Sequence, residues 1–487
     1  MTKELVWFLP LSLVTMTVLV LVRFLLPRLW AVARQTVAEA IRMKIAVFFL
    51  VLMVLGFWAA TRAGGDGSLT GRVQAYLVYS LTTVSVLLAL LSIFLSRSLS
   101  DELVNRQILM LMAKPLSRWQ YLMGKWLGIV LLNAGLLIMA GGGVYLTVVF
   151  YLARQPAMND HDRTRLGEEV LIARHASPFD IPDEGFNQQV KALYQKNLEE
   201  GIYDERPTLD PEAEKALLYT YVSSRWRYVP VGEARTFRFS NVLCDRDPEK
   251  FIQVRYKAEA RRYPPDEILR TRWAAGDPQK GIPTYVQDVR HIVGRYHTMH
   301  FPADSVGPDR TLNVTFINAN MFPGEEQFDN VMLFEGDRAV EVLFEVGTFG
   351  GNLIRLLVLI QCKLMFLAAV SLMFATVFSF PVAVLCSLTV YVLASLRQFL
   401  DDAIGFLENQ GATGLYKTVF PWLLEGLYLV IPNFGAYDGI EVLADGRNVS
   451  LAWVLLAILW LVLIGTTLAS LLGCVLFHRR EVSEVSV

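Results

Sequence analysis

The stretch that decides the fold is residues 98–125, which read SLSDELVNRQILMLMAKPLSRWQYLMGK. Ser98 followed three residues later by Asp101 fits the start of a helix, with Ser98 as the N-cap. Asp101 and Glu102 then occupy the first turn, where the helix dipole favours negative charge. We therefore expect a helix over residues 101–113.

The end of this helix is equally well marked. Lys114 places a cation in the last turn, and Pro115 stops the helix directly afterwards. Ser117 can cap a second helix that begins at Arg118. The stretch is therefore expected to form one of two structures. It is either a rigid helix–proline–helix unit that can transmit a force from a soluble partner to the membrane helices, or an ordinary basic loop between spans.

The composition places this stretch in a membrane protein. Of the 487 residues, 54% are apolar and 19% are charged, whereas soluble domains carry about 25% charged residues. Four cysteines cannot form a disulfide framework for a chain of this length. A net charge of −1 argues against a protein that binds nucleic acid through bulk positive charge.

Several segments are apolar and long enough, or nearly so, to span a bilayer, which needs about 20 apolar residues in a helix. They are Leu5–Leu26, Ile45–Ala60, Ala75–Leu95, Trp126–Leu152, Ile354–Phe378, Val382–Leu396 and Leu451–Phe477. Two of them, Ile45–Ala60 and Val382–Leu396, are short for spans. The sequence between residues 152 and 354 has soluble composition, so two membrane blocks flank one inserted domain.

The positions of Lys and Arg predict the orientation, because cytoplasmic loops carry an excess of positive charge. The richest clusters follow the first span, follow the third span and close the last span. They hold Arg28, Arg34, Arg42 and Lys44; Arg97, Arg106, Lys114, Arg118 and Lys125; and Arg479 and Arg480. Placing these in the cytoplasm of a bacterial inner membrane puts the C-terminus inside, and the N-terminus and residues 153–350 outside.

Residues 33–44, ARQTVAEAIRMK, precede the second span. Val37 and Ile41 share one helical face, and Glu39 and Arg42 belong to a polar side, which suits a helix lying in the membrane interface. The alternative is a plain helical linker with snorkelling arginines.

Taken together, these features resemble the ATP-binding-cassette type-2 permeases. The first cytoplasmic loop of that family has an acidic start, a Leu-rich helix, a Lys-Pro-x-Ser-Arg turn and a Gly-Lys pair before the next span. The corresponding residues here are Asp101-Glu102, Ile108–Leu111, Lys114–Arg118 and Gly124-Lys125. Residues 36–42 are similar to the family's elbow helix, and SFPVAV at 379–384, IPNF at 431–434 and FHRRE at 477–481 also fit.

The resemblance implies a non-catalytic membrane subunit, driven by a separate cytoplasmic ABC ATPase and paired with a second copy or a related permease among membrane lipids. ATP and Mg would reside on the ATPase, and this chain would hold no cofactor. The sequence agrees, because it contains no Gly-x-x-x-x-Gly-Lys-Ser/Thr motif. The residues that the resemblance assigns to ATPase coupling are Asp101, Glu102, Arg106, Lys114, Pro115, Arg118, Glu39 and Arg42.

Two features depart from the family pattern: Leu5–Leu26 adds a span before the elbow helix, and the inserted domain is far larger than the usual outer loop. We expect an α-helical polytopic membrane protein, a six-span permease core plus one extra N-terminal span, with an inserted α+β extracytoplasmic domain containing a β-sandwich. The expected divisions are residues 1–27, 28–152, 153–350 and 351–487, with a helical part at 153–228 and a β-rich part at 229–350.

Three polar residues inside the membrane blocks are further candidates. Lys363, beside Gln361, is a functional candidate if it lies in mid-membrane, because a charge there is costly. If the helix begins outside the membrane, Lys363 instead snorkels at the outer interface. Asn133 marks close helix packing rather than a substrate contact. The segment 401–447 is expected to form a partly re-entrant or interfacial hairpin.

The inserted domain begins with helical pieces, Phe186–Glu200 and Pro211–Ser224. The β-branched and aromatic runs that follow predict an antiparallel sandwich. These runs are Ala234–Val242, Phe251–Ala258, Thr284–Val293, Thr311–Ile317 and Val331–Val346, the last with a hairpin turn at Gly336-Asp337. His291 and His297 would share a face of one strand, but no convincing set of metal ligands accompanies them.

Three functions remain open from the sequence. The first is the permease of an ATP-driven exporter. The second is a mechanotransmitter that uses the same ATPase to act on periplasmic partners without moving a substrate. The third is a membrane-anchored extracytoplasmic binding module, which would need no structured cytoplasmic loop.

Overall fold

The computed structural model describes residues 23, 26–62, 69–105, 116–152, 166–200, 211–261, 267–320, 331–409 and 431–479, apart from 168, 245, 249 and 337. These residues fall into two compact units. One unit combines Met1–Ala173 with Gly347–Val487, and the other is Arg174–Val346. Most of the first expected span, Leu5–Leu26, lies outside the described residues.

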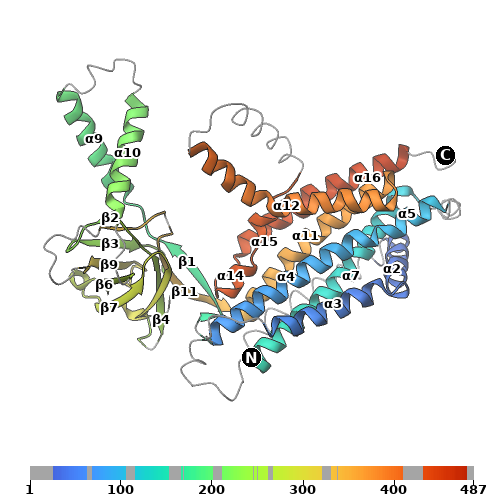
Figure 1. Cartoon of the computed structure of the whole chain (residues 1–487), viewed down its shortest axis with the longest axis horizontal. Coiled ribbons are helices and arrows are strands. Elements are labelled where there is room, and N and C mark those ends of the chain that lie inside the picture. The colour runs from blue at the N-terminus through green and yellow to red at the C-terminus, as the bar shows by residue number, and fades with distance from the viewer. Residues whose placement is uncertain are drawn as a thin grey trace. The chain divides into compact units, whose positions relative to one another are not determined.

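The first unit is helical (Figure 1). Its elements are α2 (Pro27–Arg42), α3 (Ile45–Ala60), α4 (Leu69–Leu95), α5 (Arg97–Val104), α7 (Arg118–Leu146), η1 (Thr147–Leu152), α11 (Phe349–Val377), α12 (Phe380–Asn409), η4 (Gly435–Tyr437), α14 (Ile440–Ala444), α15 (Leu451–Ala457), η5 (Ile458–Thr466) and α16 (Thr467–Arg479). Apolar runs long enough for a bilayer form long helices, as their composition predicts.

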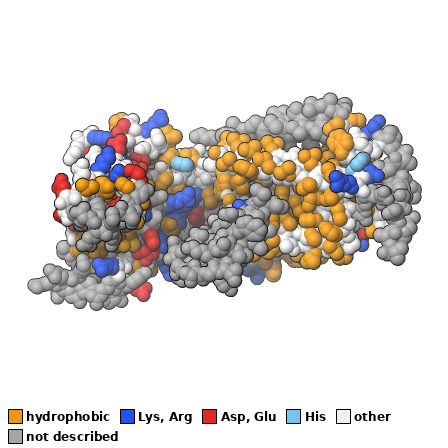
Figure 2. Space-filling model, turned by 90° about the horizontal axis from the view of Figure 1, so that it is seen from above, with side chains coloured by type: hydrophobic (Ala, Val, Ile, Leu, Met, Phe, Trp, Pro, Cys, Tyr) orange, Lys and Arg blue, Asp and Glu red, His pale blue; other side chains and the backbone are white. Residues whose placement is uncertain are grey.

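Within the described part of the chain, 5 helical segments are long and apolar enough to cross a membrane. The count reaches 6 if the pair α2–α3, bent by 62°, is taken as one span. These helices confirm a multi-pass membrane protein. Figure 2 shows hydrophobic side chains covering much of this unit, whereas charged side chains are interspersed over the β-rich unit.

Helix α11 is the central helix of this unit. It packs against α4, α7, α12, η5 and α16, and of the candidate spans it is the most buried. Figure 1 shows α4, α7 and α11 running side by side. A helix that is apolar around most of its circumference suits the interior of a bundle, and the largely apolar sequence of α11 fits that position.

The structure corrects one sequence prediction at the loop. Ser98 does not cap a helix beginning at Asp101, because α5 already begins at Arg97 and contains both residues. The Ser98 hydroxyl instead accepts a hydrogen bond from Lys125 on α7. Ser98 is buried, and its side chain serves the contact between helices rather than a helix end. The second helix starts at Arg118, as predicted.

In its described residues, the second unit contains a helix pair and three small sheets (Figure 1). The helices are α9 (Asp183–Glu199) and α10 (Pro211–Arg227), and the strands are β1 (Ile172–Pro178), β2 (Tyr228–Val229), β3 (Ala234–Phe239), β4 (Phe251–Lys257), β5 (Glu259–Ala260), β6 (Ile268–Ala275), β7 (Tyr285–Ile292), β8 (Tyr296–Pro302), β9 (Leu312–Asn318), β10 (Met332–Leu333) and β11 (Val340–Thr348). The strand orders are β1-β11-β4-β8, β2-β10-β5 and β3-β9-β6-β7.

One apolar core joins these sheets. Phe301 and Val342 come from the first sheet, and Phe237 and Phe316 come from the third. Trp273 on β6 is fully buried, and its ring centroid lies 4.5 Å from that of Tyr256 on β4. Inward-facing side chains of antiparallel sheets thus share one interior, as in a β-sandwich.

Two details of the β-rich unit differ from the sequence prediction. The runs before and after Gly336 do not form a hairpin, because β10 pairs with β2 and β5 whereas β11 pairs with β4. The predicted runs do not include β1, β2, β5, β6 or β8, and β1 lies in the part expected to be helical. Strand β6 nevertheless alternates half-buried or exposed residues with buried ones. Its two arginines, Arg270 and Arg272, weaken the apolar signal in the sequence.

His291 and His297 lie on β7 and β8 rather than on one strand, and their rings stack with centroids 4.2 Å apart. Burial raises the pKa of Tyr256 to about 12, so its hydroxyl stays protonated and can donate to His291 Nδ1, 2.7 Å away. Burial, together with the nearby His297, lowers the pKa of His291 to about 4. His291 is therefore neutral in the folded protein.

This arrangement predicts acid sensitivity of the β-rich unit. An unfolded histidine takes up a proton below about pH 6.5, whereas folded His291 does so only near pH 4. Stability is therefore fully present above about pH 6.5 and falls as the pH drops toward 4. Glutamine does not titrate. We therefore expect the unfolding temperature of the full-length His291→Gln chain to fall less steeply between pH 7 and 5 than that of wild type.

The measurement is thermal unfolding of the detergent-purified chain, followed by tryptophan fluorescence. His175→Gln in the same unit is the matched control, since His175 contacts Phe344 but lies outside the stacked pair. If His291→Gln and wild type lose stability in parallel on acidification, the stacked pair is not the acid-sensitive element.

Candidate functional site

Helices α2 and α7 lie in close contact because α7 carries two glycines one turn apart. A Cβ atom on Gly124 would lie 2.6 Å from Cβ of Val32, and one on Gly128 would lie 2.7 Å from Cβ of Thr36. Small residues at this spacing let helix backbones approach each other within a membrane protein. The elbow helix α2 is therefore seated directly on the start of α7.

Lys125 lies between these glycines and is buried, with a side chain 2% exposed. Its Nζ is 2.9 Å from Oε1 of Glu102 and 2.9 Å from Oγ of Ser98, both on α5. It is also 3.5 Å from Oε2 of Glu39 on α2. We call these four residues the Lys125 cluster, and it joins three helices that are separate in sequence.

The Lys125 cluster contains one basic and two acidic side chains. One ammonium faces two carboxylates, and Oε2 of Glu102 is buried with no hydrogen-bond partner among the described residues. Removing charges from water is costly unless each is well paired. The cluster therefore places strong demands on the mutual position of α2, α5 and α7.

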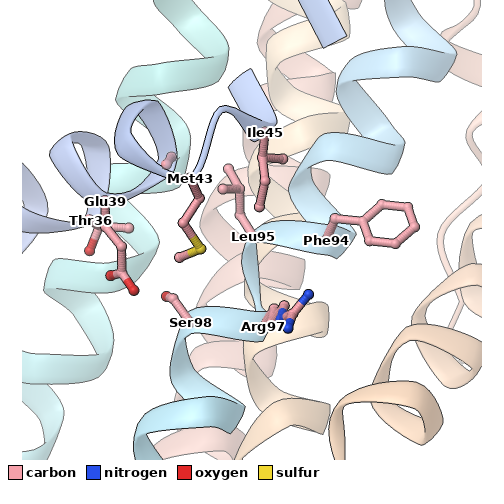
Figure 3. Close-up of a pocket in the computed structure, with 9 residues that line it drawn as sticks. Thr36, Glu39, Met43, Ile45, Phe94, Leu95, Arg97 and Ser98 are labelled. Atoms are coloured by element: carbon pink, nitrogen blue, oxygen red, sulfur yellow. The ribbon is translucent and has the colours of Figure 1, made fainter. Parts of the chain in front are cut away.

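A small cavity adjoins the cluster (Figure 3). Its volume of about 10 Å³ is close to what one water molecule requires. Glu39 reaches it from α2 and Ser98 from α5, while Phe94 and Leu95 come from the end of α4 and Ile45 from the start of α3. The bend between α2 and α3 is thus packed against the junction of α4 and α5.

Arg118, the first residue of α7, binds the end of the last helix. Its Nη1 donates to the carbonyls of Phe477 and His478, each at 2.8 Å, and its guanidinium lies over the Phe477 ring. A cation beside the final carbonyls of a helix satisfies groups that lack partners within that helix. The start of α7 and the end of α16 are therefore connected.

The remaining predicted coupling residues lie outside the Lys125 cluster. Asp101 is exposed and pairs with Arg97 at 3.0 Å, and Arg42 is exposed in the last turn of α2. Arg106, Lys114 and Pro115 lie outside the described residues. The structure thus brings Glu39 and Glu102 together, and it places Arg118, Asp101 and Arg42 elsewhere.

The predicted intramembrane residues connect helices. The Asn133 amide on α7 donates to Oγ of Ser92 on α4 at 2.7 Å, and Ser371 on α11 donates to the Ser92 carbonyl at 3.3 Å. Gln361 on α11 donates to the carbonyl of Val130 on α7 at 3.3 Å. These bonds support a packing role for Asn133.

Lys363 lies at the midpoint of α11, because the helix begins at Phe349 rather than at the predicted Ile354. Asp438, just after η4, exerts an electrostatic attraction on it. The mid-membrane and interfacial positions of Lys363 both stay predictions. A functional role for Lys363 stays a prediction.

The sequence marks Lys125 as one of the basic residues after the third span and as part of the Gly124-Lys125 pair, but not as a buried ion-pair partner. Two signals could have marked it: a lysine within an apolar helix, and glycines at 124 and 128 that predict a close helix neighbour. Its carboxylate partners could not be identified from the sequence, because Glu39 lies 86 residues away.

The fold and this site define the class of protein. It is a multi-pass membrane protein in which buried charges connect the elbow helix α2, the short helix α5 and the long helix α7. Residues 30–166 match the family described as ABC-2 family transporter protein. No curated protein and no solved structure matches the chain. The match confirms the resemblance to ABC-2-type permeases and supports a permease component of an ABC transporter.

Members of this family are membrane components rather than enzymes, and the family implies association with an ABC ATPase. The matched segment contains most of α2 and all of α3, α4, α5 and α7. The whole Lys125 cluster therefore lies inside the matched segment.

Replacing Lys125 by Met removes the ammonium but keeps an unbranched side chain. The Glu102 carboxylate is then buried without a cation, and breaking a buried ion pair in this way costs about 3–5 kcal/mol. We expect a clear fall in the thermal unfolding temperature of the detergent-purified chain, followed by tryptophan fluorescence.

Arg97→Ala is the matched control, because its pair with Asp101 is exposed and such pairs contribute below about 1 kcal/mol. Adding Glu102→Gln to Lys125→Met should recover part of the loss, since it neutralises the unpaired carboxylate. An unfolding temperature unchanged by Lys125→Met would show that the cluster does not hold the three helices together.

Proposed function

We propose that the chain is the permease subunit of an ABC exporter, in which a separate ATPase moves the membrane helices by acting on α5 and the elbow helix α2. The observation that carries this proposal is the Lys125 cluster, in which one buried ammonium binds both α5 and α2 to a helix that crosses the membrane. A force applied to either short helix is transmitted directly to α7.

The solvent-exposed face of α5 is suited to bind the ATPase and receive such a force. Val104 is 70% exposed, and Asp101 is also exposed. Glu102, on the same short helix, is buried against Lys125. A partner that binds the exposed residues of α5 would therefore displace Glu102, and with it Lys125 and α7.

A second connection extends the movement to the last helix. Because Arg118 binds the final carbonyls of α16, a displacement at the start of α7 also acts on the end of α16. Helix α16 in turn packs against α11, the central helix of the unit. This sequence of contacts offers a route from the ATPase to the middle of the bundle.

The proposal includes an orientation and a second permease. Residues 98–125 and the C-terminus would face the cytoplasm, and the N-terminus and the inserted domain would lie outside a bacterial inner membrane. The positive charges beside the spans support this placement. A dimer with a second copy or a related permease is inferred from the family resemblance, and ATP with Mg would be bound by the ATPase.

Co-purification tests the coupling. The tagged full-length chain, extracted mildly from native membranes, should retain a soluble protein with a phosphate-binding loop, identified by mass spectrometry. The double substitution Asp101→Arg with Val104→Asp changes the exposed side of α5 without touching the Lys125 cluster. We expect it to reduce the retained ATPase at least several-fold.

Arg62→Glu provides the matched control, because Arg62 is an exposed residue just past the end of α3, on the side proposed to face outward. It should leave the retained ATPase unchanged. If wild type retains no such ATPase, the coupling proposal fails and the membrane-anchored binding module becomes the better reading. If the α5 variant retains as much as wild type, the docking site is elsewhere.

One observation favours a mechanotransmitter as the second candidate. Strand β11 ends at Thr348 and α11 begins at Phe349, so the central membrane helix continues directly into a strand of the inserted domain. Thr348 accepts a hydrogen bond from the Gly351 amide and caps α11. The chain therefore passes from the inserted domain into the central membrane helix without an intervening loop.

Reconstitution distinguishes the two candidates. The complex of the chain with its ATPase, in proteoliposomes loaded with an extract of small cellular solutes, should show ATP-dependent loss of at least one solute if it is an exporter. Substituting a non-hydrolysable ATP analogue should abolish the loss. ATP hydrolysis at a normal rate with no change in the solutes would instead support the mechanotransmitter.

A further inference from the structure

The β-rich unit contains a groove of about 750 Å³ between the helix pair α9–α10 and the neighbouring strands. Figure 1 shows α9 and α10 side by side, with β2 following directly from α10. The side chains that line the groove include Lys196, Tyr221, Arg225, Trp226, Tyr228 and Arg235. The volume falls within the range of about 300–1,000 Å³ typical of small-ligand sites.

The groove is strongly basic. Lys196, Arg225, Arg235 and Arg261 line it, against the single carboxylate of Glu233 among its described lining residues. None of the three arginines forms an ion pair with a described carboxylate. Lys196 does pair with Glu200, but only at 3.7 Å and in an exposed position. The arginines therefore leave positive charge directed at the groove.

Arg235 is held in place by contacts with uncharged groups, and the attraction of Glu233 offsets part of its charge. Its guanidinium lies over the Trp226 ring, 5.4 Å from the centroid, and Nη2 donates to the Tyr228 carbonyl at 3.3 Å. Its Nε is buried without a hydrogen-bond partner among the described residues. A fixed planar guanidinium with spare donors is suited to bind a carboxylate.

Aromatic side chains accompany these cations. Tyr221 is 52% exposed and Tyr228 is 40% exposed, and the Tyr221 hydroxyl is 3.4 Å from Arg225. The Trp226 ring already contacts the side chains of Arg235, Phe179 and Phe186. The two tyrosine rings are therefore the faces left available for a flat, partly apolar ligand surface.

A peptide strand is not favoured as the occupant. Strand β2 lies at the edge of its sheet but is 2 residues long. Its carbonyls are already bound, that of Tyr228 by Arg235 and that of Val229 by Asn318. An added strand needs a free row of backbone groups, and this edge does not provide one.

We propose that this groove binds an acidic saccharide, with sugar rings against Tyr221 and Tyr228 and carboxylates against Arg235 and Arg261. Sugar rings present flat C–H faces to aromatic side chains, and their carboxylates match the guanidinium donors in shape and charge. The site is extracytoplasmic in the proposed orientation, but its ligand chemistry does not depend on ATPase coupling.

The experiment is calorimetric titration of the full-length chain in detergent with trigalacturonate, with maltotriose as the neutral saccharide of equal length. We expect saturable binding of trigalacturonate alone, weakening as salt is raised. Triglutamate and inorganic phosphate are titrated in parallel to separate a saccharide site from a peptide site or a simple anion site.

Variants assign the binding to the groove. Arg235→Gln and Arg261→Gln should each weaken binding about tenfold, the expected effect of losing one charge-assisted contact. Glu233→Gln should strengthen it, because it removes the opposing charge. Arg238→Gln is the matched control, since Arg238 is exposed on β3 three residues beyond Arg235 and so on the opposite face of the strand.

The Arg261→Gln variant keeps the test valid if Arg235→Gln does not fold. The Arg261 side chain forms no hydrogen bond or ion pair with described residues, so its replacement is not expected to disturb the fold. Selective binding that is lost in the arginine variants and kept in Arg238→Gln supports the proposal. Equal binding of maltotriose, stronger binding of triglutamate or phosphate, full binding by both arginine variants, or no saturable binding of trigalacturonate would each overturn it.

Discussion

The ammonium of Lys125 is the constraint on which the rest of the helical unit depends. A cation that is almost fully buried must keep its partners, because an unpaired charge in that position would cost several kcal/mol. Its partners come from α2 and α5. These contacts connect the elbow helix, the end of the third span and the start of the fourth.

Away from this cluster, the helices are held by close packing and by a few internal hydrogen bonds. Lipid is as apolar as a leucine side chain, so burial alone gives little reason for helices to associate in a bilayer. Small residues and polar contacts supply the specificity instead. Gly124 and Gly128 admit α2, Gly141 admits Leu357 of α11, and Asn133 joins α7 to α4.

The inserted domain follows the opposite rule, since its core is the kind that water drives together. Trp273, Tyr256 and Phe316 fill the space between its sheets, and most of its described charged residues lie at or near the surface, with Arg174 and Glu341 as buried exceptions. That surface includes the basic groove beside α9 and α10. The chain thus combines a unit shaped by membrane packing with one shaped by the hydrophobic effect.

The sequence by itself determined the membrane class, the positions of most long helices and the β-rich character of the inserted domain, because these depend on local runs of apolar, β-branched and breaker residues. It also indicated the permease family through the order of its loop motifs. Only the tertiary structure decided that Glu39 and Glu102 meet Lys125, that Arg118 binds the end of α16, and that β10 and β11 part into different sheets. Those outcomes depend on contacts between residues far apart in the chain, and local sequence patterns carry no record of which distant partner a side chain will meet.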